Sequence, residues 1–282
     1  FVYTYNDEVS VCAVLPDAME EFECAVLAKD FGTLLNKMAD EEIELFQSDA
    51  ALSIVSKRIK ADIVIEQEVK MPIDEINIPE KFAALPDDFV VALKSCLPIV
   101  GKDMSKPLST CLHLCEDRVE TSDVDRAGRY MLAKPVFKKA VYLPGTSARI
   151  VTRFSVKKFA VNTGWIHFEC KDGTILSCRT YYENQEFADL TPLLEQEGTG
   201  ISLPSALSDA LDRSGIFVHS TDGTEVTMED KHVKISISEN WCTVRGEGTI
   251  GRYEEKVRMS YDGKPIAFTT SAEMLAEALE KN

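Results

Sequence analysis

The side chains best suited to chemistry gather in one stretch, CLHLCEDRVETSDVDRAGRY, from Cys111 to Tyr130. On an extended strand Cys111, His113 and Cys115 would share one face, and thiols and imidazoles are ligands for zinc. Residues two apart on a strand lie about 7 Å from each other, however, and the ligands of one zinc ion must lie much closer. The sequence offers no tight second pair of ligands, such as Cys-x-x-Cys. We therefore predict a packed strand face with no bound metal, in a protein that needs no cofactor.

Two carboxylates in the same stretch, Asp123 and Asp125, are typical of a hydrolase or a phosphoryl-transfer enzyme. Such a pair can act in general acid–base catalysis or hold a divalent cation. Carboxylates two apart in a loop usually point away from each other, and acidic loops are common in a chain with a net charge of −16. We therefore predict no catalytic residues. A metal-dependent phosphoesterase that uses this loop remains the alternative, and loss of turnover in Asp123→Asn would favour it.

The segment GEGTIG, from Gly246 to Gly251, matches the dinucleotide-binding pattern G-x-G-x-x-G. That site requires a strand before the glycines and a helix directly after them, so that the pyrophosphate meets the N-terminus of the helix. The residues that follow, RYEEKVRMSYDG, alternate as a strand does. We expect these glycines to relieve crowding in a strand pair.

The charge of the chain limits how it can bind nucleic acid. Lys and Arg number 31 among the 282 residues, against 47 Asp and Glu. A protein this acidic cannot hold DNA on a broad basic face, so any contact must come from a localised patch.

The cysteines and the apolar runs indicate the cellular compartment. The eight cysteines are scattered, and no secretory signal precedes them, which favours reduced thiols in the cytoplasm. No apolar run approaches the roughly 18 residues that span a bilayer. The chain opens at Phe1, inside an expected strand and without Met, so we expect a piece of a longer protein.

A helical segment recurs along the chain at intervals of roughly 60 residues. The expected helices begin near Ala28, Pro86, Arg149, Pro204 and Ser271. Between them lie segments in which apolar and polar residues alternate, the pattern of half-buried antiparallel strands. The alternating segments are EEIELFQ, ALSIVSKRI, WIHFEC, TILSCRTYY, HVKISIS and KVRMSYDG.

Asp-Gly pairs at 172–173, 222–223 and 262–263 are expected to make tight turns between strands. The repeated unit is then a strand, a helix and a three-stranded meander. Pairing two units lets two helices and two sheets close one core. We predict an α+β fold of pseudo-symmetric pairs.

Three stretches of the chain resemble the bacterial-type DNA polymerase III beta sliding clamp. They are VYLPGTSARIVTRF with WIHFECKDGTILSCRTYYENQEFADL, then VETSDVDRAGRYML, and the segment from HVKISISENW to EMLAEAL. The resemblance implies a non-enzymatic ring whose helices surround duplex DNA, with antiparallel sheets outside. It implies clamp domain one (latter part) in 1–80, domain two in 81–198 and the first part of domain three in 199–282. A homo-oligomer, with a dimer favoured, would close the ring.

The expected DNA contacts are basic residues on or near equivalent helices, where the fold implied by the resemblance faces the duplex. Arg149 and Arg153 are four apart and are expected to share a helical face, with Val151 and Phe154 turned to the core. The expected DNA-binding residues are Lys29, Lys37, Lys94, Lys102, Lys106, Arg149, Arg153 and Lys157.

The resemblance also implies a pocket that binds short peptides of the polymerase and of the clamp loader. Its expected walls are Leu108, Asp123, Arg126, Ala188, Pro192 and Leu193. Val124, Asp125 and Ala127 replace the Gly, His and Leu that are usual in the family, which puts peptide specificity in question. A clamp-like scaffold that binds proteins and does not encircle DNA is a further alternative.

Overall fold

In a computed structural model, the chain forms two compact units, residues 1–194 and 195–282. The residues described are 1–15, 23–38, 42–69, 71, 73–181, 187–198, 200–218 and 232–279. Among them, no helix is long and apolar enough to cross a membrane.

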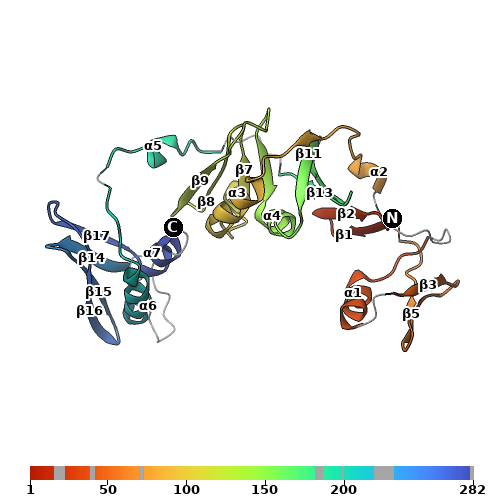
Figure 1. Ribbon diagram of the computed structural model, residues 1–282, viewed down its shortest axis with the longest axis horizontal. Coiled ribbons are helices and arrows are strands. Elements are labelled where there is room, and N and C mark those ends of the chain that lie inside the picture. Colours follow the sequence, from red (N-terminus) through yellow and green to blue (C-terminus); the bar gives the residue numbers. More distant parts are fainter. Residues whose placement is uncertain are drawn as a thin grey trace. The chain divides into compact units, whose positions relative to one another are not determined.

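The larger part of the first unit consists of two antiparallel sheets with helices packed on them (Figure 1). The six-stranded sheet, in spatial order, contains β1 (Val2–Tyr5), β2 (Val9–Ala13), β13 (Ile175–Arg179), β12 (Trp165–Cys170), β11 (Val156–Asn162) and β6 (Ala83–Ala84). The four-stranded sheet contains β10 (Val141–Pro144), β7 (Cys111–Leu114), β8 (Arg118–Ser122) and β9 (Ala127–Met131). The helices are α3 (Phe89–Cys96) and α4 (Gly145–Val151), with short 3-10 turns η1 (Leu97–Ile99) and η2 (Pro107–Thr110).

The predicted repeat occurs twice in this region, as β6-α3-β7-β8-β9 and as β10-α4-β11-β12-β13. The two copies exchange their first strands, because β6 pairs with β11 and β10 pairs with β7. Each sheet therefore contains a strand of the other copy, and this exchange joins the two copies of the repeat in one core. The α+β prediction is confirmed.

The shared core takes its largest side chains from both helices and both sheets. Phe89 of α3 lies against Phe168 of β12 and against Phe137, with ring centroids 5.7 Å and 5.9 Å apart. Leu112 of β7 is completely buried, and so is Val151 of α4, which the sequence predicted to face the core. Burial of such side chains is the main stabilising contribution, at about 1.5–3 kcal/mol each.

A smaller layer in the same unit is formed by α1 (Ala28–Lys37) and the sheet β3 (Glu44–Gln47), β4 (Ala51–Val55) and β5 (Lys60–Val64). Leu52 and Ile54 of the central strand are buried, and their neighbours along β4 are half-buried, as the alternating pattern predicts. The short helix α2 (Ile73–Ile76) follows, and the Asn162 amide of β11 donates to the carbonyl of Asn77 at 2.7 Å.

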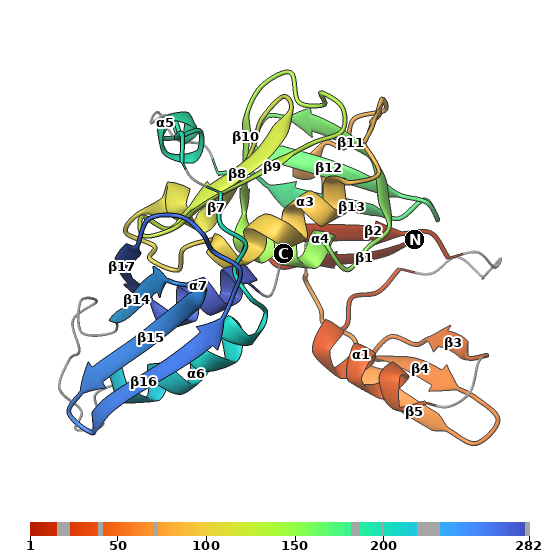
Figure 2. The same cartoon turned by 60° about the vertical axis from the view of Figure 1, so that its left-hand side comes forward.

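The second unit repeats the pattern with α6 (Ala206–Val218), β14 (His232–Ser238), β15 (Trp241–Gly248), β16 (Gly251–Arg258), β17 (Ile266–Ser271) and α7 (Ala272–Leu279) (Figure 2). Its sheet has the order β16-β15-β14-β17. The GEGTIG segment joins β15 and β16, and Gly246 pairs with Tyr253, so the strand-pair interpretation is confirmed. A Cβ at Gly248 would collide with the carbonyl oxygen of Phe217, which explains the glycine there.

Several local expectations are wrong, and the first concerns α4. The α4 helix begins at Gly145 and ends at Val151, so Arg153 lies beyond it. The backbone N–H groups of Arg153 and Phe154 bond three residues back, so the regular helical spacing expected for Arg149 and Arg153 does not extend to Arg153.

The second error concerns the Asp-Gly pairs. Asp262-Gly263 lies in the connection from β16 to β17, which are not neighbours, so it makes no hairpin. Asp172-Gly173 does make the predicted hairpin, with Gly173 at φ 85°. The pair at 222–223 lies outside the described residues.

Candidate functional site

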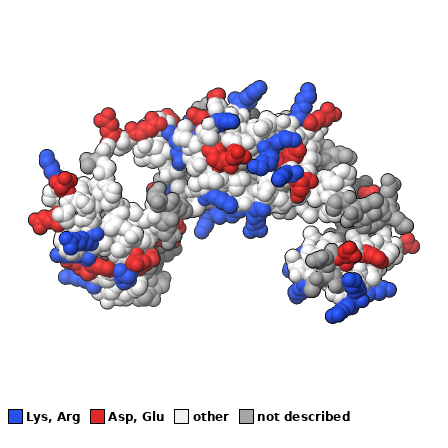
Figure 3. Space-filling view, viewed as in Figure 1, with Lys and Arg blue, Asp and Glu red and all other residues white. Residues whose placement is uncertain are grey.

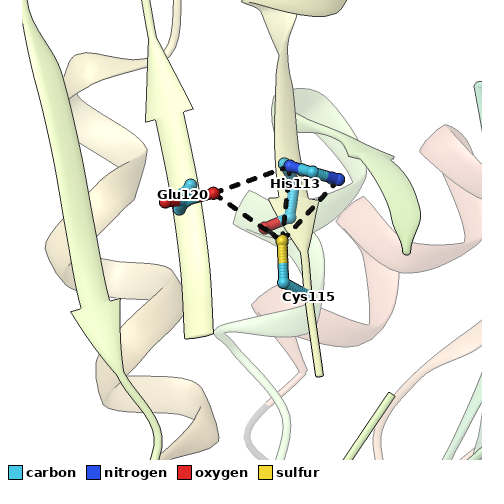
Figure 4. Close-up of side chains that lie close together, drawn as sticks. All are labelled: His113, Cys115 and Glu120. Carbon is cyan, nitrogen blue, oxygen red and sulfur yellow. Dashed lines mark hydrogen bonds and ion pairs between the residues drawn. The ribbon is translucent and has the colours of Figure 1, made fainter. Parts of the chain in front are cut away.

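The cysteine and histidine side chains of the Cys111–Tyr130 stretch lie closer together than their spacing suggested. Strand β7 ends at Leu114, and Cys115 turns its sulfur back against the His113 ring, 3.4 Å from Nδ1 and 3.7 Å from Nε2. Glu120 of β8 joins them, with Oε2 3.7 Å from the sulfur and 3.8 Å from Nδ1 (Figure 4). Within the described parts of the chain, these three residues form the cluster with metal-ligand chemistry, and Cys111 is not a member.

The His113, Cys115 and Glu120 cluster is not arranged as a metal centre. A metal bound in the ring plane to one imidazole nitrogen would place a thiolate ligand about 3.5 Å from that nitrogen and about 5 Å from the other. The Cys115 sulfur is instead nearly equidistant from both nitrogens. It rests against the ring, and the ring would have to turn before the three donors could share an ion.

The protonation states in this cluster do not favour nucleophilic chemistry. Burial, reinforced by the charge of Glu120, raises the pKa of the Cys115 thiol to about 12. Burial also lowers the pKa of His113, with Glu120 opposing that shift. At neutral pH the thiol is protonated and the imidazole is uncharged. A protonated thiol is a weak nucleophile, so Cys115 is not a reactive cysteine.

Glu120 is the charged centre of the cluster. Its side chain is 4% exposed, and its Oε1 accepts a hydrogen bond from Arg129 Nε at 2.6 Å. Arg118 Nε lies 3.1 Å from the same oxygen as a second ion-pair partner. A buried carboxylate of this kind persists because cations neutralise it.

The Asp123 and Asp125 loop forms the turn between β8 and β9. Asp123 Oδ2 accepts hydrogen bonds from Nε and Nη2 of Arg126, at 3.0 Å and 2.8 Å. Asp123 Oδ1 accepts the backbone N–H groups of Asp125 and Arg126. Because both oxygens of Asp123 already have partners inside the turn, the carboxylate shapes the loop, with Val124 in the left-handed region at φ 86°. Nothing in this arrangement favours general acid–base catalysis.

The predicted pocket residues fall into two groups in the structure. Leu108 lies in η2, and Gly101 connects η2 to the Asp123–Arg126 turn. The Gly101 N–H donates to the carbonyl of Ser109 in η2, and a Cβ at Gly101 would lie 3.4 Å from the Asp123 side chain. Ala188, Pro192 and Leu193 lie on the segment 187–194, which ends in the short helix α5 (Thr191–Leu194).

The segment 187–194 is bonded to the four-stranded sheet by residues that are not among those predicted from the sequence. Arg129 of β9 donates from Nη2 to Thr191 Oγ1 at 2.9 Å. The Phe187 ring lies 4.8 Å from the His113 ring, and its N–H donates to the Tyr142 hydroxyl. Glu120 and Arg129 face each other across the β8–β9 hairpin, so an opposite-charge pair could have been found once the register was known.

The predicted DNA-binding residues lie on several elements. Lys29 and Lys37 are on α1, Lys94 on α3 and Arg149 on α4. The remaining four are Lys102 and Lys106 between α3 and β7, Arg153 after α4, and Lys157 on β11. On the face shown in Figure 3, basic side chains project over the region of α3 and α4. Lys157 is paired with Asp87 at 3.2 Å, so it is a weaker candidate for phosphate contact.

Comparison with solved structures gives a consistent result, although no protein-family model and no curated protein matches the chain. The DNA polymerase III subunit beta of Pseudomonas aeruginosa matches with a TM-score of 0.79 at 14% identity. The pol III beta of Caulobacter crescentus also gives 0.79 at 14%, and the DNA polymerase sliding clamp of Bacillus subtilis gives 0.76 at 15%. Each match covers 99% of this chain and 78% of the other. The chain has the sliding-clamp fold. The likeness lies in the arrangement of helices and strands.

Proposed function

We propose that the protein is a DNA sliding clamp: a non-enzymatic ring that encircles duplex DNA and tethers the replicative polymerase. The observation that carries this proposal is the sliding-clamp fold along 99% of the chain. The paired strand-helix-meander units support it further, because they repeat one architecture along the chain as a ring of similar domains requires. We propose a homo-oligomeric ring in the cytoplasm, with a dimer favoured, and three domains at 1–80, 81–198 and 199–282.

The DNA contacts proposed for this clamp are the basic residues of α1, α3 and α4 and of the turns after them. Their number is small, and the chain is otherwise strongly acidic. A clamp needs weak contact that is independent of sequence, because each phosphate contact adds to the resistance against sliding and to the salt dependence. Repulsion from the acidic surface would confine the duplex to the basic helical faces.

Partner proteins are proposed to dock a short peptide in the pocket formed by Leu108, the Asp123–Arg126 turn and the segment 187–194. Leu193 and Leu194 are exposed leucines at the end of that segment, which suits them as apolar anchors. The polymerase and the clamp loader are the proposed partners. The Arg126–Asp123 pair would form the polar edge of the pocket.

A topological assay tests the proposed function. The full-length protein, loaded by its own clamp loader, should co-elute with nicked circular DNA in gel filtration and separate from linear DNA of the same length. Equal retention on both would mean that the protein binds duplex without encircling it. A scaffold that binds proteins alone would be retained on neither.

A further inference from the structure

Glu120, Arg129 and Thr191 form a continuous chain of contacts from the interior of the four-stranded sheet to the helix α5. Glu120 Oε1 accepts from Arg129 Nε at 2.6 Å, and Arg129 Nη2 donates to Thr191 Oγ1 at 2.9 Å. The arginine side chain is 11% exposed, and the carboxylate is 4% exposed. One planar guanidinium therefore joins a strand to a helix 62 residues further along the chain.

The buried charge at Glu120 fixes the position of Arg129. A buried carboxylate that loses its cation costs far more than an exposed one, because water cannot replace the partner. Arg129 is therefore held with its fork aligned, and little further entropy is lost when it also binds Thr191. Thr191 is also the first residue of α5, and its N–H donates to Asp189 Oδ1 at 2.9 Å.

A second contact holds the other end of the same segment. The His113 ring contacts both the Tyr142 ring and the Phe187 ring, with centroids 4.9 Å and 4.8 Å away. The Phe187 N–H donates to the Tyr142 hydroxyl at 3.1 Å. Figure 4 shows the contacts of Glu120 with both His113 and Cys115, so the imidazole belongs to the same cluster as the carboxylate. Segment 187–194 is thus tied at two points, Phe187 and Thr191, to one group of polar and aromatic side chains around Glu120.

We propose that Glu120 is a positioning residue for the peptide pocket, and that it acts through Arg129 and Thr191 to hold the wall that carries Pro192 and Leu193. This inference rests on the proposed peptide-binding function. Glu120 does not touch the peptide. It determines where α5 lies relative to the β8–β9 turn, and therefore how well the two groups of pocket residues match one ligand.

The test combines peptide binding with hydrogen–deuterium exchange on the full-length protein. The probe is a fluorescein-labelled tail peptide of a bacterial DNA polymerase, and the variants are Thr191→Val, Arg129→Lys, Glu120→Gln and the Thr191→Val/Arg129→Lys double variant. Thr191→Val should weaken binding by about threefold to tenfold, the effect of one lost hydrogen bond. Arg129→Lys keeps a positive charge beside Glu120 but loses the planar guanidinium that bonds Glu120 and Thr191 at the same time. The double variant should bind no more weakly than Arg129→Lys alone, because both changes break the same link.

Exchange reports the position of the wall without any ligand. The N–H groups of Leu193 and Leu194 bond the Leu190 carbonyl, and they should exchange faster in each variant at a temperature well below its melting point. Thr152→Val is the matched control, because the Thr152 hydroxyl donates to the Arg149 carbonyl within its own helical turn. It should change neither binding nor exchange in 187–194. Should Glu120→Gln fail to fold, Thr191→Val and Arg129→Lys still test the link.

The results distinguish an error in the positioning role of Glu120 from an error in the peptide pocket. Unchanged exchange at Leu193 and Leu194 in Thr191→Val and Arg129→Lys would overturn the positioning role. Faster exchange with unchanged affinity would also overturn it, provided that Leu193→Asp weakens binding. If Leu193→Asp leaves affinity unchanged, the pocket is wrong, whatever the exchange shows.

Discussion

Leu193→Asp is the sharpest test of the proposed pocket. The Leu193 side chain is 60% exposed, so a docked peptide could bury most of it. Burying a whole leucine is worth about 1.5–3 kcal/mol, and burying the exposed 60% is therefore worth about 1–2 kcal/mol. That corresponds to about fivefold to thirtyfold in affinity. An aspartate would add the cost of covering a charge, so the loss should be at least this large.

Fluorescence polarisation with the labelled polymerase tail peptide measures this loss directly. Ile216→Asp is the matched control, because Ile216 is also 60% exposed and lies on α6, a helix that contributes none of the proposed pocket residues. It should leave peptide affinity unchanged. Thermal unfolding of both variants should be similar, since each places a charge at an exposed position. The pocket assignment is refuted if Leu193→Asp binds the peptide as tightly as the parent protein, or if Ile216→Asp loses as much affinity.

Three further predictions follow from charges and burial. Replacing Arg149 and Arg153 by Ala should shorten retention on circular DNA and flatten the salt dependence by roughly one to two phosphate contacts, whereas an unchanged slope of log K against log salt would remove them from the interface. His167 is fully buried, and burial lowers its pKa to about 4, below the ordinary 6.5. As the pH falls, the His167 side chain of the unfolded chain takes up a proton before that of the folded chain does. The contribution of neutral His167 to the free energy of unfolding is therefore complete above pH 6.5 and is lost as the pH falls toward 4. Denaturant titrations should show that His167→Asn, which cannot titrate, loses about 3 kcal/mol less between pH 7.5 and pH 4 than the parent, and equal losses would contradict the assignment. Elemental analysis should find no stoichiometric transition metal, and a metal that disappears in Cys115→Ser would show that the cluster at His113 is a metal site.

The secondary structure could be predicted from the sequence wherever local pattern determines it. The alternating segment HVKISIS forms the strand β14, and the segment after Pro86 forms the helix α3, as predicted. Helix ends were less predictable. No residue near Val151 marks the end of α4, because the chain tightens into a 3-10 turn through backbone bonds that no side chain specifies.

Strand pairing could not be predicted, because partners distant in sequence determine it. The exchange of β6 and β10 between the two repeats follows from closure of the shared core, which no segment encodes alone. For the same reason WIHFEC was expected to be half-buried, whereas Trp165 and His167 are buried together with Ile166 and Phe168 on the other face. β12 is a central strand of the six-stranded sheet.

The candidate site shows the same limit. Asp123 and Arg126 could be placed from a short turn, since residues so near in sequence meet by local geometry alone. Glu120, Arg129 and Thr191 required the β8–β9 register and the path of a segment far along the chain. The close approach of His113 and Cys115 was also missed, because it depends on where β7 ends.

Release on cutting tests the sliding-clamp proposal most directly. The fluorescently labelled full-length protein would be loaded by its clamp loader onto a circular duplex with one restriction site, and free protein removed. Cutting the circle should then release the protein within the time it takes to slide to an end, while an uncut circle or a circle without the site retains it. Retention that is unchanged by cutting would contradict encirclement, and with it the proposed function.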